Sequence, residues 1–88
     1  MIKKVEIFLN EMDIVSGIAS HENFITFLID TAEISDNKTL SDQEFKAFEN
    51  NFRSVLKEFN ILDNNKISLK IDDYVEDQVC FILTLEES

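Results

Sequence analysis

The chain has 88 residues, of which 18 are Asp or Glu and 8 are Lys or Arg, so its formal net charge at pH 7 is -10. This length suits one domain and leaves no room for a second hydrophobic core. Hydrophobic residues make up 44% of the chain and eight residues are Phe, which excludes a disordered acidic tail. Residues 1–88 are therefore predicted to form a single acidic α+β domain.

The N-terminal segment is predicted to be a strand. Val5, Ile7 and Leu9 alternate with the residues between them, which is the period-two pattern of extended backbone. The alternation slips after Leu9, which indicates a bulge. A short helix over residues 11–19 is the competing interpretation.

The segment from Phe24 to Ile34 is predicted to be a second strand. It is rich in β-branched and aromatic residues, which favour extended backbone. Together with the first strand it would form a hairpin, with the polar loop Ser16–Asn23 between them.

The clearest element is a helix from Ser41 to about Asn60. Ser41 and Glu44 have the spacing of a capping box, in which each side chain accepts a hydrogen bond from the backbone of the other. Six apolar residues then recur at spacings of three and four, which places them on one side of the helix. They are Phe45, Phe48, Phe52, Val55, Leu56 and Phe59.

After the turn at residues 63–65 the hydrophobic period changes to two. The two alternating runs, 67–72 and 79–86, are joined through residues 75–78 and predict a second hairpin. The expected order is therefore ββαββ. This order predicts an α+β fold in which a single four-stranded, mainly antiparallel sheet carries one amphipathic helix on one face.

The charge is distributed unevenly along the chain. Residues 5–37 contain seven acids and residues 71–88 contain six, and neither segment has a Lys or Arg. Residues 38–70, which hold the predicted helix, contain five acids and six bases. The acidity is therefore expected on the two hairpins.

The sheet face that the helix leaves open is the predicted interaction surface. In the expected registers, the apolar residues Phe8, Leu28 and Ile82 lie on this face and carboxylates border them. The candidate partner-binding residues are Glu6, Phe8, Leu28, Asp30, Asp72, Asp73, Glu76, Asp77, Ile82 and Glu86. Solubility and protection of strand edges are the alternative explanation of the same carboxylates.

These features predict a small, non-catalytic binding protein that inhibits or regulates a basic, nucleic-acid-binding partner, such as a nuclease or another effector. Alternate residues of a strand are about 6.7 Å apart on one face, so a row of carboxylates would present negative charge to a groove made for phosphates. In size and charge the chain is similar to phage-encoded anti-restriction and anti-CRISPR decoys and to toxin-immunity proteins. The alternative function is a structural or assembly subunit, or a homodimer, that pairs through the open face.

Other partners and locations are disfavoured by composition. No apolar run approaches the roughly 20 residues that span a bilayer, so no membrane association is predicted. Cys80 is the only cysteine, which excludes an internal disulfide and is typical of a cytoplasmic protein. Proteins bind phosphates largely through Lys and Arg, so direct nucleic-acid binding is not expected of so acidic a chain.

No cofactor, catalytic residue or metal site is predicted. His21 and Cys80 are the only His and Cys, whereas a closed zinc site needs four ligands. The segment Glu33–Glu44 carries oxygen side chains at the spacing of a degenerate EF-hand calcium loop, which is a minor alternative function. Lys38 stands where that loop needs glycine, so the segment is better explained as a loop leading into a capped helix.

Overall fold

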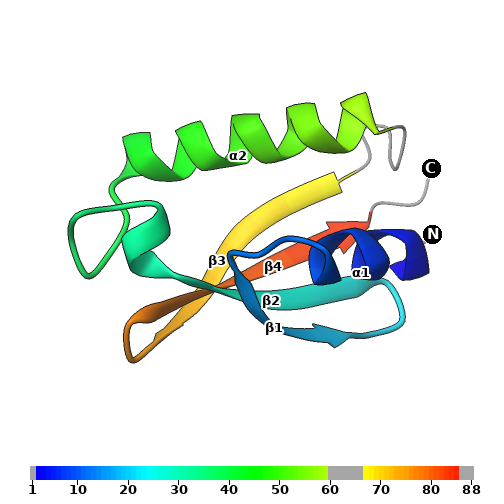
Figure 1. Cartoon of the computed structure of the whole chain (residues 1–88), viewed down its shortest axis with the longest axis horizontal. Coiled ribbons are helices and arrows are strands. Elements are labelled where there is room, and N and C mark those ends of the chain that lie inside the picture. The colour runs from blue at the N-terminus through cyan, green and yellow to red at the C-terminus, as the bar shows by residue number, and fades with distance from the viewer. Residues whose placement is uncertain (1, 60–66, 86–88) are drawn as a thin grey trace.

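The computed structural model describes residues 2–59 and 67–85. Four strands form one antiparallel sheet in the order β1-β2-β4-β3, with a helix between the second and third strands along the chain (Figure 1). This arrangement confirms the predicted α+β fold and its ββαββ order. The elements are α1 (Ile2–Asn10), β1 (Val15–Ser20), β2 (Phe24–Asp30), the 3-10 turn η1 (Thr31–Glu33), α2 (Asp42–Glu58), β3 (Ile67–Val75) and β4 (Gln78–Leu85).

Side chains of the two central strands, β2 and β4, alternate strictly between the two faces of the sheet. One face is covered by the helices and its side chains are fully buried, as the alternation of apolar residues predicts. The buried residues are Ile25, Phe27 and Ile29 of β2 and Val79, Phe81 and Leu83 of β4. The residues between them are only half-buried, because nothing in the described part of the chain covers the opposite face.

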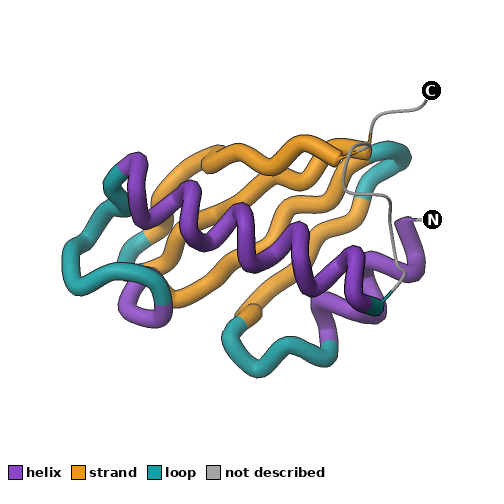
Figure 2. Tube along the Cα trace, turned by 90° about the horizontal axis from the view of Figure 1, so that it is seen from above, coloured by secondary structure: helices purple, strands orange, loops and turns teal. Residues whose placement is uncertain are grey.

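The core between helices and sheet is built from aromatic rings. Phe27 stacks on Phe52 of α2 at 5.6 Å and on Phe81 of β4 at 5.4 Å between ring centroids, and Phe48 stacks on Phe81 at 4.7 Å. From α1, Phe8 reaches Phe52 edge-on at 6.5 Å. Figure 2 shows α2 crossing the sheet with α1 beside its C-terminal end, so both helices cover the same face.

The predicted N-terminal strand is wrong, because residues 2–10 form α1. Val5 and Leu9 are fully buried and Met12 packs against the same core, a spacing of four and three that fits a helix. Ile7, which the period-two pattern counted as a core residue, is 61% exposed. The helix forms because it buries one continuous stripe against the sheet.

The first strand is β1, within the segment predicted to be a polar loop or, in the competing interpretation, a short helix. A bulge does occur, but it lies between Val15 and Gly17 of β1 and not after Leu9. Residue Asp30 ends β2 four residues earlier than predicted. Its carboxylate accepts a hydrogen bond from the backbone N–H of Ala32 at 3.1 Å and so begins η1.

The capping box predicted at the start of α2 is confirmed. The backbone N–H of Ser41 donates to Oε1 of Glu44 at 2.8 Å, and the N–H of Glu44 donates to Oγ of Ser41 at 3.2 Å. The hydrogen bond from the Ser41 backbone to the Glu44 carboxylate, and after it one from the Ser35 side chain, hold the pKa of Glu44 below its ordinary value. The Glu44 carboxylate therefore caps the N-terminus of α2.

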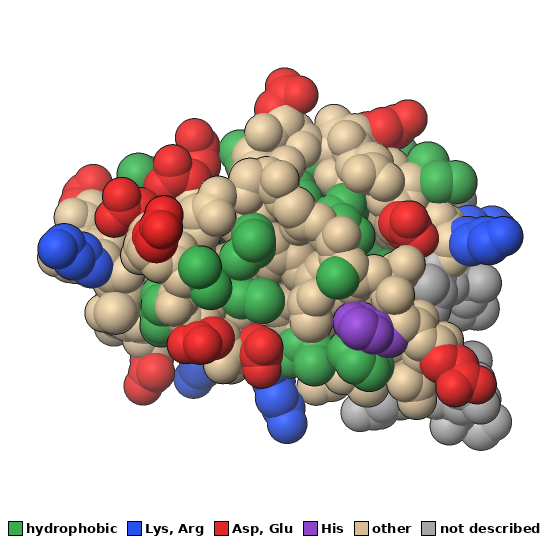
Figure 3. Space-filling view, turned by 90° about the horizontal axis from the view of Figure 1, so that it is seen from below, with side chains coloured by type: hydrophobic (Ala, Val, Ile, Leu, Met, Phe, Trp, Pro, Cys, Tyr) green, Lys and Arg blue, Asp and Glu red, His purple; other side chains and the backbone are tan. Residues whose placement is uncertain are grey.

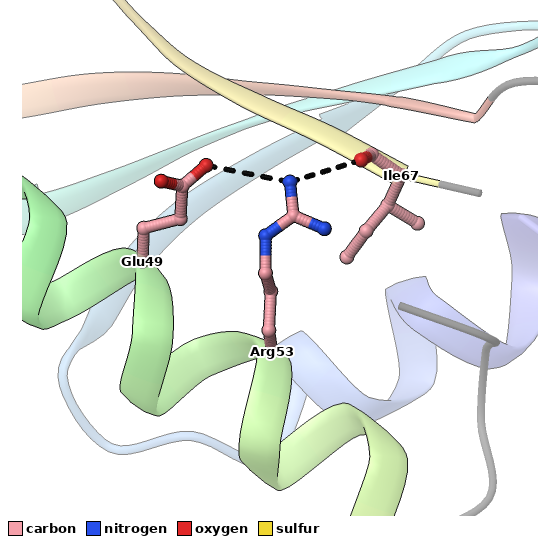
Figure 4. A network of polar contacts seen from close by, with 3 residues as sticks. All are labelled: Glu49, Arg53 and Ile67. Carbon is pink, nitrogen blue, oxygen red and sulfur yellow. Dashed lines mark hydrogen bonds and ion pairs between the residues drawn. The ribbon is translucent and has the colours of Figure 1, made fainter. Parts of the chain in front are cut away.

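Arg53 ties α2 to the edge strand β3 (Figure 4). Its Nη2 donates to the backbone carbonyl of Ile67 at 3.0 Å and lies 3.4 Å from Oε2 of Glu49. Because Ile67 is the first residue of β3, this contact places the beginning of the strand beneath the helix.

The turn between β3 and β4 contains backbone strain. Val75 pairs with Gln78, so Glu76 and Asp77 are the two turn residues, and Glu76 has a φ of 57°. This left-handed region suits glycine and costs another residue about 1–2 kcal/mol.

Glu76→Gly is therefore expected to raise the free energy of unfolding by up to about 1 kcal/mol. Part of the relief is offset because glycine has more freedom in the unfolded chain. Urea denaturation measures the difference, and Glu76→Gln is the matched control that removes the same charge and keeps the strain. If both variants are stabilised equally, the gain comes from charge and not from the backbone.

Candidate interaction surface

The open face of the sheet carries an apolar patch over its central strands (Figure 3). Leu28 of β2 pairs in register with Cys80 of β4, and Ile82 of β4 lies two residues further along the same face. All three side chains are half-buried. Val75, at the end of β3, adds an apolar side chain that is 48% exposed. Leu28, Cys80 and Ile82 share this face because β2 and β4 leave alternate residues on it.

Carboxylates gather around the end of the sheet that holds η1 and the β3–β4 turn. We call this group the acidic end, and all of its members are exposed. It consists of Asp30, Glu33, Asp36, Asp72, Asp73, Glu76 and Asp77. Only two lysines, Lys38 and Lys70, lie on the same segments, so the acidic end has a net negative charge.

A bulge in β3 brings two neighbouring carboxylates to this surface. The register shifts between Ile71 and Asp73, so Asp73 lies opposite Cys80 and Asp72 is the extra residue. Strict alternation would have turned Asp73 toward the helix-covered face. The bulge keeps both side chains in water, and it increases the negative charge beside the apolar patch.

A cleft of about 510 Å³ opens at the acidic end, between η1 with its following loop and the β3–β4 turn. The backbone N–H of Thr31 donates to the carbonyl of Asp77 at 2.9 Å and so joins the end of β2 to the turn. The lining residues are Asp30, Thr31, Ala32, Ser35, Asp36, Asn37, Lys38 and Asp77. Three carboxylates against one lysine make the cleft suited to a cationic group.

The opposite end of the open face is less charged. His21 stacks on Phe24 with their ring centroids 4.3 Å apart, and Phe24 lies outside the aromatic core. The open face is therefore electrostatically asymmetric, with an aromatic end and an acidic end. An asymmetric face fixes the orientation of a charged partner.

The structure brings together most of the predicted surface residues. Leu28 and Ile82 form the patch, and five of the predicted carboxylates belong to the acidic end. The placement of Glu6 and Phe8 on this face is wrong, because both are in α1 and Phe8 packs against Phe52 and Phe59. Glu86 lies outside the described residues.

Sequence reasoning did not assign Val75, Phe24 or the aromatic stacking with His21 to the surface. The predicted connection between the strands includes Val75, whereas β3 extends through it. The sequence does carry a signal that places Phe24 on the open face. Phe24 directly precedes Ile25, which begins the alternating series of buried residues in β2, so its side chain points to the opposite face.

Burial raises the pKa of the Cys80 thiol above its ordinary value, and the charges of Asp72 and then Asp73 raise it further. Replacing both aspartates with Asn should therefore lower this pKa and speed alkylation of Cys80 by iodoacetamide at fixed pH, because the thiolate is the nucleophile. The pH dependence of the alkylation rate measures the shift. Asn at Asp13 together with Gln at Glu58, which changes the net charge equally elsewhere, should leave the rate unchanged.

An equal acceleration in both double variants would contradict the placement of Asp72 and Asp73 beside the thiol. An unchanged rate in the Asp72 and Asp73 variant would contradict it as well.

Within residues 2–59 and 67–85, no three His, Cys, Asp or Glu side chains are grouped so that they could hold a metal ion. In the same ranges, no helix has the length and apolar character that crossing a bilayer requires. No family model, curated protein or solved structure matches the chain.

Proposed function

We propose that this chain is a non-catalytic binding protein that covers a basic, nucleic-acid-binding surface of a partner protein and thereby inhibits or regulates it. The observation that carries the proposal is the acidic end beside the apolar patch of the open face. A partner of this class, such as a nuclease or another effector, has a groove lined with Lys and Arg that normally holds phosphates.

Long-range attraction supports this choice of partner. The chain carries a net charge of -10, and the seven carboxylates of the acidic end are exposed to solvent. Such a field steers a basic surface toward the acidic end and raises the association rate. The attraction is screened beyond about 8–10 Å at physiological salt, so the exposed carboxylates act mainly on encounter and orientation.

The apolar patch supports a lasting complex. Buried apolar anchors, and not rim charges, usually contribute most of the binding energy of an interface. Leu28 and Ile82 sit at the centre of the open face, and Asp73 lies directly beside Cys80 at its border. This is the usual arrangement of an apolar centre with a polar rim.

The cleft at the acidic end offers a place for a basic side chain of the partner. Asp30, Asp36 and Asp77 contribute carboxylates from three separate segments. An Arg side chain carries a planar fork of donors that carboxylates accept well. We therefore expect Arg to be preferred over Lys at this point of the interface.

The biological setting that suits these properties is an anti-restriction or anti-CRISPR protein of a phage, or an immunity protein against a nuclease toxin. Homodimerisation or assembly through the open face is the second candidate function, favoured by the same apolar patch. The two differ in their response to salt. Binding of a basic groove weakens as salt is raised, whereas an apolar self-contact between acidic chains does not.

The test is affinity capture on the immobilised chain, with competition. A host lysate is passed over the wild-type chain and over a matched column carrying Asp72→Lys and Asp77→Lys. We expect the wild-type column alone to retain a basic protein, and we expect duplex DNA or RNA to release it. Retention of the same proteins by both columns, or no release by nucleic acid, would contradict the proposal.

A further inference from the structure

We infer that the outer edge of β1 is a pairing site for a second copy of this chain. Two β1 strands would join antiparallel about a twofold axis and extend the sheet from four strands to eight. Within the described residues, β1 is an edge strand that pairs only with β2 (Figure 1). This inference concerns a different surface from the open face and stands independently of the proposed function.

The charge pattern of β1 is that of an internal strand. Residues 14–21 contain no Asp, Glu, Lys or Arg, although 30% of the chain is charged. The only other uncharged stretches of seven residues or more cover the central strands, at residues 23–29 and 78–85. Exposed edges are normally protected by charges or proline, and β1 has neither.

The other edge of the sheet is protected in the usual ways. β3 carries Lys70, Asp72 and Asp73, and its bulge interrupts regular pairing. Arg53 also donates a hydrogen bond to the carbonyl of Ile67, at the beginning of the strand. The sheet therefore has one edge, β3, that is protected from pairing and one edge, β1, that is uncharged. This difference points to a partner strand at β1.

The backbone of β1 can supply a regular ladder beyond its bulge. The N–H of His21 donates to the carbonyl of Phe24 at 2.8 Å, which makes this pair hydrogen-bonded. Hydrogen-bonded and non-bonded pairs alternate in an antiparallel ladder. The N–H and C=O groups of Ile18 and Ser20 therefore point away from β2 and are available to a second strand. In a twofold pair, Ile18 would bond to Ser20 of the second copy, with Ala19 near the axis.

The distribution of charge favours a second copy in this antiparallel arrangement. Val15, at the start of β1, pairs with Ile29, so this end of the strand lies beside Asp30 and the acidic end. Antiparallel pairing places the two acidic ends at opposite ends of the joined strands. Parallel pairing would place them side by side. Two chains of charge -10 repel each other, and their uncharged edges are where they approach at the lowest electrostatic cost.

The size of the side chains also suits close approach. Outside Val15 and Ile18, β1 consists of the small residues Ser16, Gly17, Ala19 and Ser20. Ala19 and Ser20 are exposed, so their side chains leave the outer edge accessible.

Sedimentation equilibrium tests the inference between about 1 µM and 1 mM, the range in which dimers of moderate affinity dissociate. We expect a dimer of twice the 10.2 kDa chain mass. Its dissociation constant should fall as salt is raised, because salt screens the repulsion between the acidic chains. Ala19→Glu should weaken dimerisation at least tenfold, since the two introduced carboxylates face each other across the axis. Ser54→Glu adds the same charge on the exposed side of α2 and should leave the dimer unchanged.

Ser20→Pro is the second variant, because it removes an outward N–H donor without adding charge. Circular dichroism melts verify that each variant is folded. The inference is overturned if the wild-type chain remains monomeric throughout the concentration range. A dimer that resists both Ala19→Glu and Ser20→Pro in folded variants, or one that Ser54→Glu disrupts equally, also overturns it. Ala19 lies opposite Thr26 on the open face, whereas Ser20 lies opposite the buried Ile25. Capture of a basic partner is therefore scored separately, with the Ser20→Pro variant.

Discussion

Phe52→Ala is expected to lower the free energy of unfolding by about 3–5 kcal/mol, the usual cost of removing a buried Phe from a core that relaxes only partly. The ring is 3% exposed and contacts Phe27 of β2, Phe48 of α2 and Phe8 of α1. It is therefore the point where both helices meet the sheet. Denaturation by urea, followed by circular dichroism, measures the loss.

Phe59→Ala is the matched control for this prediction. The chemical change is the same and the residue directly follows α2, but the ring is 64% exposed and contacts Phe8 alone among the aromatic rings described. A cost below about 1 kcal/mol is expected, because little area is removed from the core. Equal costs for the two variants would mean that the helices do not pack on the sheet as described.

Reversing charge at the acidic end is expected to weaken binding of the basic partner far more than the same change elsewhere. The variant Asp72→Lys with Asp77→Lys raises the net charge by four units at the border of the open face. Neither side chain is seen to accept a hydrogen bond in the described structure, so the fold should be little affected. We expect at least a tenfold loss of affinity, mostly in the association rate.

The control is Asp13→Lys with Glu58→Lys, which raises the net charge equally at exposed positions outside the acidic end. Glu49 is unsuitable for this purpose because it pairs with Arg53 at 3.4 Å. Surface plasmon resonance at low and physiological salt gives both rate constants. Equal losses in the two double variants would mean that net charge, and not its location, governs binding, and the acidic end would then serve solubility.

Several features of the fold could be predicted from the sequence because one physical pattern allowed only one interpretation. In α2, the capping box and a stripe at spacings of three and four agree with each other. In β4, the strict alternation of core-facing apolar residues over Gln78–Leu85 fits a strand and does not fit the period of a helix. The central strands were therefore placed correctly, and with them Leu28 and Ile82 of the open face.

The N-terminal segment could not be assigned because its pattern fits two periods. Val5 and Leu9 are four residues apart, which is both two strand repeats and about one helical turn. Only the residues between them distinguish the cases, and there Phe8 packs inward while Ile7 is exposed. The misplacement of Glu6 and Phe8 on the open face followed directly. The acidic bulge at Asp72 could not be foreseen either, because a bulge is set by pairing with the neighbouring strand.

The pairing of β2 with β4 has a consequence for synthesis of the chain. Phe24 lies opposite Thr84, so the two strands at the centre of the sheet are neighbours although η1, α2 and β3 lie between them in the sequence. On a ribosome, β2 has no neighbour on that side until β4 has emerged. Contacts of such long range are also slow to form. During this interval the nascent chain exposes uncharged strands, and the seven acids of residues 5–37 keep it from associating with other nascent copies.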